Sequence, residues 1–351
     1  MLNHWFVLLN TNHFFSFPKT CLRFLMVKFE KKTKYTENSF PVKFEKKIKY
    51  TGNKIPDELP HAFFLGIVLL TAVFILYFVG FIFYSAIPVF ESQGIINFIT
   101  GDSWNNGNFG IRNFIVGTLI ITAVTIILAV PPSIFTAIFL SEFASPKVVS
   151  VFRPLIELLV GIPSVVYGIF GLYVLADILK HVDPIISSIF YFIPFMRDTT
   201  PGQGDGVFLS SVVLSIMILP TIITISEDSI RAVPGVYREA SFALGATKWE
   251  TIRHVVLPAA SGGILSAVVL GIMRAMGETM AVVMLIGNIN RIPSSIFGYT
   301  LPMTTKIVTS VGENIGNPDV LSALFGIAAV LFALEILLAG FAKLLVRRCK
   351  Y

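Results

Sequence analysis

The sequence predicts an all-α, polytopic membrane protein with six transmembrane helices and a cytoplasmic helix-turn-helix segment. Three observations predict this fold. Hydrophobic residues make up 54% of the 351-residue chain and charged residues 14%, with a mean hydropathy of +0.78, whereas about 25% of the residues of ordinary soluble domains are charged. Six apolar stretches are long enough to cross a bilayer, which takes about 20 residues. A polar break between two of these stretches has helical periodicity.

The chain divides into an expected cytoplasmic tail, residues 1–60, and a membrane domain, residues 61–351. Residues 1–25 contain neither a continuous span nor a signal-peptide pattern, and the basic segment that follows suggests Met26 as the translation start. A direct repeat occupies residues 27–36 (VKFEKKTKYT) and 42–51 (VKFEKKIKYT). We expect a solvated tail here, and contact with anionic lipid head groups is the alternative.

Cysteine usage and net charge exclude other classes of function. Cys21 and Cys349 have no spacing typical of a disulfide framework or a metal site, so we expect no metal, no cofactor and no catalytic residue in this chain. The net charge of +6 could indicate nucleic-acid binding. Membrane proteins, however, gather Lys and Arg in cytoplasmic segments, so we expect no nucleic-acid partner.

The six predicted spans are residues 62–89, 112–139, 151–178, 207–228, 262–287 and 320–346. Most of the 27 Lys and Arg residues lie before Ala62, around Lys147, around Arg238 and at the C-terminus. The positive-inside rule therefore predicts a multi-pass protein of the cell membrane with both termini in the cytoplasm. Residues 101–110, 181–206 and 288–320 would be outer connecting loops that could receive a delivery protein, with Trp104 as an interfacial anchor.

The third span contains a Gly-Ile-Pro-Ser run at residues 161–164. Pro163 removes a backbone donor, which membranes tolerate where protein or a wet cavity supplies a replacement. Two interpretations stay open: a kink beside a transport pathway, or a packing kink with Ser164 bonded to a backbone carbonyl. Nearer the start of the span, Glu157 is expected to pair with Arg153 one turn earlier.

The polar break at residues 234–258 predicts two short helices. The first runs from Val236 to Leu244 and ends at Gly245, as helices commonly end at a glycine. Thr247 and Glu250 have the spacing of a capping box that starts the second helix, and Pro258 is expected to stop it. The expected apolar faces are Tyr237, Ala240 or Ser241 and Leu244 on the first helix, and Trp249, Ile252 and Val256 on the second. Such faces can dock in a groove of a soluble protein or lie in the lipid interface.

This segment carries a family resemblance. Glu239-Ala240-Ser241, three residues, Gly245, nine residues, Val255, one residue and Leu257-Pro258 resembles the cytoplasmic EAA loop of ABC importer permeases. Residues 155–174 (LIELLVGIPSVVYGIFGLYV), 238–260 (REASFALGATKWETIRHVVLPAA) and 271–288 (GIMRAMGETMAVVMLIGN) resemble the phosphate importer permeases of the PstC type, and the similarity runs from about Phe63 to the end. Ser241 departs from the usual alanine, and the companion PstA-type permease is the nearest competing assignment.

The resemblance implies a set of partners and a site. The residues expected to contact a pair of ATPase subunits, as a coupling loop, are Glu239, Ala240, Ser241, Gly245, Leu257 and Pro258. The further expected partners are a second permease of the PstA type, an extracytoplasmic phosphate-binding protein and membrane lipid. Because the chain contains no G-x-x-x-x-G-K-[ST] loop for nucleotide phosphates, we expect a partner subunit to hydrolyse ATP and this chain not to be an enzyme.

The fifth span carries charge in an apolar run. Counted from Gly263, Arg274 would lie about 16 Å along a helix, near the middle of a hydrocarbon core about 30 Å thick, and Glu278 would follow on nearly the same face. Arg274 and Glu278 could form an internal salt bridge, or Arg274 could bind phosphate oxygens. The residues expected along the substrate pathway are Arg274, Glu278, Thr279 and Ser164.

Two other features complete the expectations for the spans. Small residues recur at Gly263, Ala267, Gly271 and Ala275, and we expect them to admit a close neighbouring helix. Glu335 lies in the last span and is expected to face the bundle interior, with no assigned role.

Two alternative functions remain at this point. Another oxyanion, such as molybdate or sulfate, could be the substrate, because an arginine fork does not distinguish these ions. An ion channel or ion-coupled carrier with Arg274 and Glu278 in its pore is the alternative from a different class. A membrane enzyme is disfavoured, since the spans lack a clustered set of residues suited to metal or nucleophilic chemistry.

Overall fold

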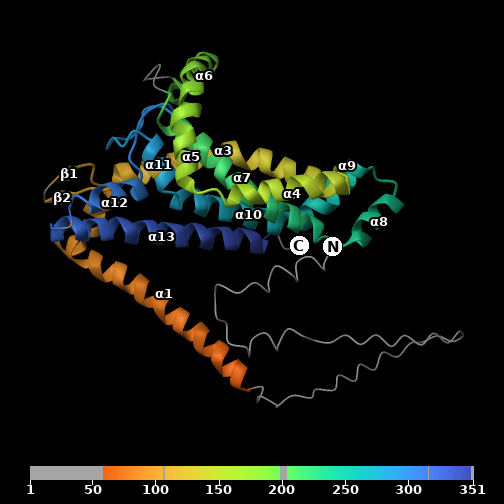
Figure 1. Cartoon of the computed structure of the whole chain (residues 1–351), viewed down its shortest axis with the longest axis horizontal. Helices are drawn as coiled ribbons and strands as arrows, with labels where there is room; N and C mark the ends of the chain where they lie inside the picture. Colours follow the sequence, from red (N-terminus) through yellow and green to blue (C-terminus); the bar gives the residue numbers. More distant parts are fainter. Residues whose placement is uncertain (1–57, 106, 198–203, 315, 349–351) are drawn as a thin grey trace, which may run out of the picture. The chain divides into compact units, whose positions relative to one another are not determined.

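A computed structural model describes residues 58–105, 107–197, 204–314 and 316–348 (Figure 1). The direct repeat, the Met26 start and the two cysteines fall outside the described residues. Residues Phe63–Tyr351 form one compact unit. Within the described chain, six helical segments are long and apolar enough to cross a membrane: Phe63–Gln93, Arg112–Phe143, Ser164–Ile189, Val207–Arg231, Lys248–Gly277 and Pro318–Leu344. The predicted six-helix membrane fold is confirmed.

The helices and strands follow one another along the chain in a nearly all-helical order. They are α1 (Glu58–Gln93), α2 (Ile95–Thr100), β1 (Trp104–Asn105), β2 (Asn108–Phe109), α3 (Arg112–Ile138), the π-helix η2 (Phe139–Phe143), α4 (Pro146–Val160), α5 (Ser164–Phe170), the π-helix η3 (Gly171–Leu175), α6 (Ala176–Ile189), the 3-10 helix η4 (Pro194–Met196), α7 (Val207–Arg231), α8 (Gly235–Ala243), α9 (Lys248–Thr251), the π-helix η5 (Ile252–Val256), α10 (Leu257–Gly277), α11 (Met280–Leu285), α12 (Met303–Val311) and α13 (Pro318–Arg348).

The core of the unit lies around α7, which packs against α3 on one side and α10 on another (Figure 1). The predicted stripe of small residues makes this packing close. An added Cβ at Gly263 would collide with Ser229, and one at Gly271 would collide with Ile222, both on α7. Ala267 and Ala275 on the same stripe are buried. The small residues therefore act as predicted, and their neighbour is α7.

α1 is attached to the unit chiefly by its last turns. The Val89 N–H donates to the Ser322 hydroxyl of α13 at 3.1 Å, and the rings of Phe81 and Phe325 meet edge to face. The earlier turns leave large apolar side chains such as Leu70 and Phe74 exposed. Such a surface suits contact with lipid, which solvates apolar side chains as water does not.

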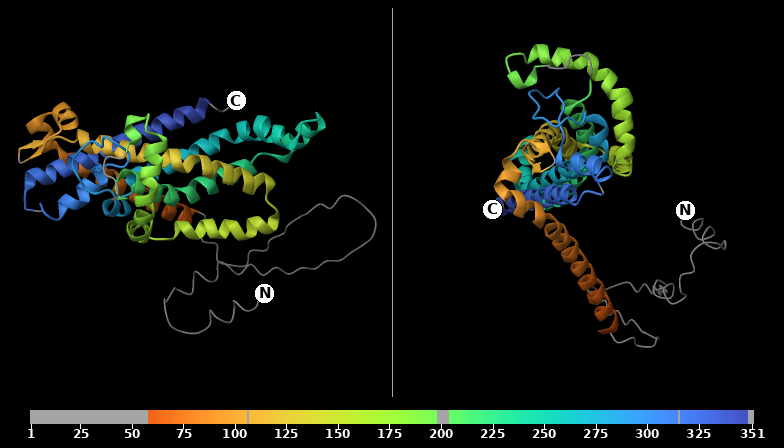
Figure 2. Two further views of the ribbon diagram at one scale, coloured as in Figure 1. Left: turned by 90° about the horizontal axis from the view of Figure 1, so that it is seen from above. Right: turned by 90° about the vertical axis from the view of Figure 1, so that its left-hand side faces the viewer.

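The third span differs from the prediction. A helix over residues 151–178 was expected, but α4 ends at Val160 and α5 starts at Ser164, so that the apolar span is Ser164–Ile189. α4 lies along α7, while α5 and α6 turn away after the break (Figures 1 and 2). The cause is local, because Pro163 cannot donate a backbone hydrogen bond and disfavours helical geometry at Ile162. Hydropathy alone had merged two separate helices.

The fifth span also has different bounds. Pro258 was expected to stop the second short helix, yet the helix continues from Lys248 to Gly277. Pro258 lies just after the π-helix η5. A π-helical turn changes the hydrogen-bond pattern of a helix locally, so the missing N–H of Pro258 is accommodated there without ending the helix. At the other end the helix stops at Gly277, ten residues before the predicted boundary at 287.

The loops predicted to lie outside the cell contain short strands and a helix. Residues 104–105 and 108–109 form an antiparallel pair of strands in which Trp104 pairs with Phe109, a small exception to the all-α prediction. The Trp104 ring packs on the rings of Phe109 and Phe114, and the Lys306 ammonium lies 4.6 Å from its centroid. Burial lowers the pKa of this lysine. Trp104 therefore anchors the hairpin to α3 and α12, and its predicted place at a membrane interface stays a prediction.

Candidate functional site

The short helices α8 and α9 are joined at Gly245, as the sequence predicts. Gly245 has a φ of +84°, a conformation that glycine adopts without strain. Its N–H donates to the Phe242 carbonyl and the Ala246 N–H donates to the Ser241 carbonyl, the two bonds that define a Schellman ending. The capping box is also confirmed, because the Thr247 hydroxyl accepts from the Glu250 N–H and the Glu250 carboxylate accepts from the Thr247 N–H.

The predicted apolar faces of these helices are only partly correct. Tyr237 and Leu244 are exposed, but Ser241 points inward and its hydroxyl lies 2.9 Å from that of Thr251 on α9. On the following segment Trp249 is exposed while Ile252 and Val256 are buried. These two side chains pack with Ile138 of α3 and Ile230 of α7, so one face of each short helix supports the fold. The exposed apolar side chains on this surface are Val236, Tyr237, Phe242, Leu244 and Trp249.

The remaining residues of the predicted coupling loop lie on both sides of this surface. Glu239 and Ala240 are exposed on α8, and Glu239 has no side-chain partner among the described residues. Leu257 packs against the apolar cluster around Ile252. Pro258 is exposed in the first turn of α10. The loop thus presents polar and apolar groups outward while its inner face joins α3 and α7.

The charged residues of the fifth span are not arranged as predicted. Arg274 lies in the last turn of α10, and the depth in a bilayer predicted by counting from Gly263 stays a prediction. Glu278 is outside the helix with an extended backbone, φ −69° and ψ 134°, and therefore does not share a helical face with Arg274. Among the described residues no ion pair joins Arg274 to Glu278, so the alternative of an internal salt bridge is not seen there.

The two side chains instead have separate partners. The partly buried Arg274 guanidinium donates to the Thr221 hydroxyl on α7 at 2.9 Å. No carboxylate of the described chain lies within ion-pair distance of it. The Glu278 carboxylate accepts from the N–H groups of Thr279 and Ala281 at 3.2 and 3.4 Å, at the start of α11. Arg274 therefore keeps unused donors beside a helix break.

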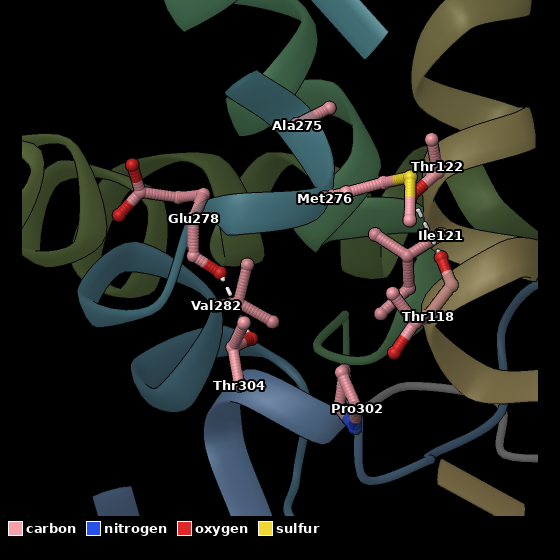
Figure 3. Close-up of a pocket in the computed structure, with 9 residues that line it drawn as sticks. All are labelled: Thr118, Ile121, Thr122, Ala275, Met276, Glu278, Val282, Pro302 and Thr304. Atoms are coloured by element: carbon pink, nitrogen blue, oxygen red, sulfur yellow. Dashed lines mark hydrogen bonds between the residues drawn. The ribbon is translucent and has the colours of Figure 1, made fainter. Parts of the chain in front are cut away.

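A small cavity lies behind this break, with a volume of about 10 Å³, room for about one water molecule. Its lining comes from α3, α10, α11 and the start of α12, and consists of Thr118, Ile121, Thr122, Ala275, Met276, Glu278, Val282, Pro302 and Thr304 (Figure 3). The Glu278 carbonyl accepts from the Thr304 hydroxyl at 3.1 Å, whereas its side chain points away from the cavity. A hydroxyl of α12 thus holds the backbone at the break, and the Glu278 carboxylate lies on the side of the backbone away from the cavity.

The other predicted pathway residues lie at two places. Thr279 is part of the break, where its hydroxyl donates to the Gly277 carbonyl at 3.3 Å. Ser164 starts α5 and its hydroxyl has no hydrogen bond within the described part of the chain, so the alternative in which it bonds a backbone carbonyl is not seen. α5 meets α11 at Gly168, which faces Ala281 and Met284. Arg274, Glu278 and Thr279 therefore lie at one helix break. Ser164 lies one helical turn before Gly168, where α5 contacts α11.

Glu335 on α13 lies beside the same break. An added Cβ on Gly277 would be 3.8 Å from its Oε1, and the side chain has no hydrogen bond or ion pair among the described residues. It is partly exposed, in a span with a mean hydropathy of 2.5. A carboxylate in such a position faces protein or a wet cavity rather than lipid, as predicted from the sequence.

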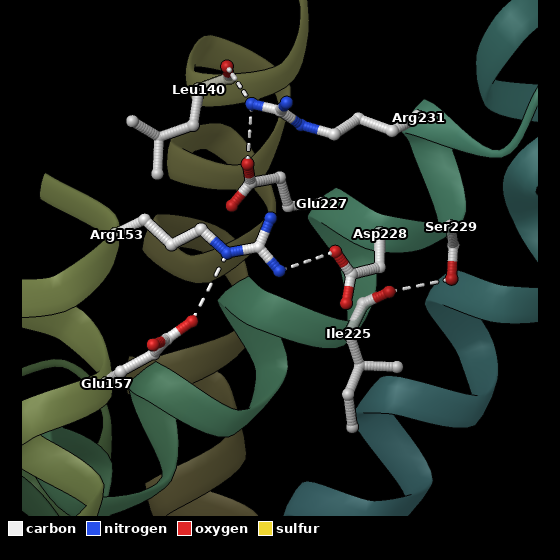
Figure 4. Close-up of polar contacts among 8 residues, drawn as sticks. All are labelled: Leu140, Arg153, Glu157, Ile225, Glu227, Asp228, Ser229 and Arg231. Carbon is white, nitrogen blue, oxygen red and sulfur yellow. Dashed lines mark hydrogen bonds and ion pairs between the residues drawn. The ribbon is translucent and has the colours of Figure 1, made fainter. Parts of the chain in front are cut away.

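Ion pairs that the sequence analysis missed gather at the end of α7 (Figure 4). The predicted pair of Arg153 and Glu157 is present at 3.2 Å, and Arg153 also binds Asp228 at 3.0 Å. Arg231 lies 2.8 Å from Glu227 and donates to the Leu140 carbonyl at 3.3 Å. The second arginine thereby joins α7 to η2.

Next to this cluster Arg238 of α8 binds Glu142 of η2 at 2.7 Å. These two residues are 96 positions apart. Spacing along the sequence therefore does not predict the pair. The only signal in the sequence is the charge of the polar segment around Arg238.

Comparison with known proteins places the chain in a family. The model of the binding-protein-dependent transport system inner membrane component matches residues 133–351. A phosphate transport system permease protein PstC of Mesorhizobium japonicum is 38% identical over 257 residues, 72% of this chain and 78% of that protein. A probable ABC transporter permease protein of Bacillus subtilis, YqgH, is 39% identical over 247 residues, 69% of this chain and 74% of that protein.

A solved structure has the same fold. It is a bacterial ABC transporter involved in the import of the acidic polysaccharide alginate, with a TM-score of 0.56 and 18% identity over 84% of this chain and 97% of that chain. This similarity concerns the fold alone. The family match, in contrast, covers more than half of the chain and agrees with the resemblance of the short helices to an EAA loop. The chain therefore belongs to the family of binding-protein-dependent transport system inner membrane components, the permease subunits of ABC transporters.

Proposed function

We propose that this permease imports inorganic phosphate in an ATP-driven transporter. The observation that carries the proposal is Arg274, a guanidinium at the end of an apolar helix with no carboxylate partner among the described residues. A planar guanidinium binds phosphate oxygens through two parallel hydrogen bonds. Identity of 38% to a protein named as a phosphate permease supports phosphate over sulfate or molybdate.

The helix break is the proposed place of passage. Glu278 and Thr279 stand outside regular helix there, and Glu278 would balance the charge of Arg274 or accept a hydrogen bond from the protonated oxygen of HPO₄²⁻. A negative charge beside the anion keeps it from binding too tightly to leave. Ser164, at the start of α5, is the proposed fourth residue of the pathway.

The proposed partners follow from the family. A pair of ATPase subunits would dock on the exposed surface of α8 and α9, a second permease of the PstA type would complete the pathway, and a soluble phosphate-binding protein would deliver the substrate. ATP binding would shift the population between inward-facing and outward-facing states. The distribution of Lys and Arg supports cytoplasmic termini and a cytoplasmic coupling loop.

The test is uptake of radiolabelled phosphate by vesicles that contain this chain, its partner permease, the ATPase and the binding protein. We expect uptake only when hydrolysable ATP is present on the side of the membrane where the ATPase subunits lie. Uptake that persists without the ATPase, or that follows an ion gradient, would support the channel or carrier alternative instead.

A further inference from the structure

Arg238 joins three elements through one side chain. Its Nε and one terminal nitrogen contact the same oxygen of Glu142, at 3.2 and 2.7 Å. The same terminal nitrogen donates to the Ile230 carbonyl at 3.0 Å and the other donates to the Val233 carbonyl at 2.6 Å. Glu142 belongs to η2 at the end of α3, and the two carbonyls belong to the end of α7 and the residues that follow it.

This contact is sheltered from solvent. The side chains of Arg238 and Glu142 are 21% and 10% exposed, and the apolar cluster of Ile138, Ile230, Val233 and Ile252 packs within the same joint. Because screening by water and salt is weaker in such a place, the ion pair holds its geometry better than an exposed pair would. The planar guanidinium also has donors in a fixed fork, so that α8 has little freedom to rotate relative to α3 and α7.

The rest of the coupling region is tied to α8. The Ser241 and Thr251 hydroxyls lie 2.9 Å apart, and the Lys248 ammonium of α9 lies 4.7 Å from the Phe143 ring centroid of η2. Movement of α8 and α9 therefore reaches the membrane helices through a defined set of contacts. Arg238 is the residue with the most bonds among them.

We propose that Arg238 is a positioning residue that clamps the coupling helix α8 to the ends of α3 and α7, so that the ATPase's motion moves these two helices together. The inference rests on the proposed function, since it assumes that an ATPase drives the chain. Arg238 is not among the residues of the proposed substrate pathway. Its loss is expected to separate ATP hydrolysis from transport rather than to abolish either assembly or hydrolysis.

The first experiment compares Arg238→Ala with the unchanged chain in the reconstituted transporter. We expect the ATPase to remain associated and stimulated by the binding protein, while phosphate imported per ATP hydrolysed falls about two- to thirtyfold, the range of coupling changes that single residues produce. The ratio of phosphate imported to ATP hydrolysed should fall similarly in Arg238→Lys, because one ammonium cannot reach all three acceptors. Lys147→Ala is the matched control, since Lys147 is exposed at the start of α4 and has no side-chain partner in the described chain.

Three results would overturn the inference: an unchanged ratio of phosphate to ATP, full function in Arg238→Lys, or loss of ATPase association, which would make Arg238 a docking contact instead. If Arg238→Ala fails to insert, Glu142→Gln tests the same clamp from α3 with α8 left unaltered. It should lower the ratio by a smaller factor, and an unchanged ratio in this variant would also contradict the clamp.

A second readout does not depend on the substrate. Spin labels at Gly235→Cys on α8, where nothing lies near an added Cβ, and at Phe139→Cys on η2, both exposed positions, are placed in a chain whose Cys21 and Cys349 are replaced by serine. With the clamp intact, the distance between the labels should stay the same when the assembled transporter binds ATP, and with Arg238→Ala it should broaden or shift. A distance that changes equally in both chains refutes the clamp. Failure of the unchanged transporter to import phosphate would refute the substrate assignment alone.

Discussion

The proposed coupling region, residues 234–258, and the charged helix end, residues 274–279, show that spacing along the sequence predicts contacts in one place and fails in another. In the proposed coupling region Gly245, Thr247 and Glu250 lie within six residues, and each forms the contact that its spacing predicts. At the charged helix end, Arg274 and Glu278 have helical spacing, yet the helix stops between them. Spacing is informative only where the backbone is known to be regular.

The comparison also separates two roles. The coupling region has exposed apolar side chains on its outer surface and an ion-paired clamp on its inner side. The charged helix end instead keeps a guanidinium without a carboxylate partner in the described chain. The first arrangement suits contact with a protein, and the second suits a passing anion. The predictions below test whether these roles are distinct.

The largest effect is expected for Arg274→Ala. Removing a charged partner of a desolvated anion costs about 2 to 5 kcal/mol, so phosphate uptake should fall by at least about thirtyfold. Insertion into the membrane and association of the ATPase should be unchanged, measured by purification of the whole transporter. Lys147→Ala is the control that removes an exposed cation, and normal uptake by Arg274→Ala would refute the site.

Gly271→Leu should destabilise the contact between α10 and α7. An added Cβ at Gly271 already collides with Ile222, and overpacking a tight interface costs about 1 to 3 kcal/mol. A lower thermal unfolding temperature in detergent measures the effect. Gly66→Leu on α1 is the control because nothing lies near its added Cβ, and equal unfolding temperatures for the two variants would contradict the packing.

Thr221→Val should weaken transport less than loss of the arginine itself. The variant removes the hydroxyl that accepts from Arg274, and a hydrogen bond to a charged group contributes about 1.5 kcal/mol or more. We expect phosphate uptake to fall about tenfold, and Thr221→Ser, which keeps the hydroxyl, to restore it. Equal uptake by the valine and serine variants would show that Thr221 does not position Arg274.

The smallest effect is expected in the coupling region. Thr247→Ala removes the capping oxygen at the start of α9 and should cost about 1 kcal/mol of local helix stability. Faster amide hydrogen exchange at residues 248–251 measures it, and Thr247→Ser should exchange like the unchanged chain. No change in the alanine variant would mean that the packing of Ile252 and Val256 alone holds this helix.

The parts of the fold that were predicted correctly depend on residues that lie close together in the sequence. The six spans, the small stripe from Gly263 to Ala275, and the Arg153 and Glu157 pair all depend on residues of one segment. The pairing of Arg238 with Glu142 could not be predicted, because it joins segments that meet only in the folded chain. The stop at Gly277 was also missed, since no proline follows it and the new start is marked only by the Glu278 carboxylate, which accepts from the Thr279 and Ala281 N–H groups at the beginning of α11.

Competition for uptake tests the central proposal most directly. The reconstituted transporter imports radiolabelled phosphate with ATP while unlabelled phosphate, sulfate or molybdate is present in large excess. The account predicts that unlabelled phosphate suppresses uptake of the label and that sulfate and molybdate leave it unchanged. Equal suppression by sulfate or molybdate would contradict the assignment of this permease to phosphate.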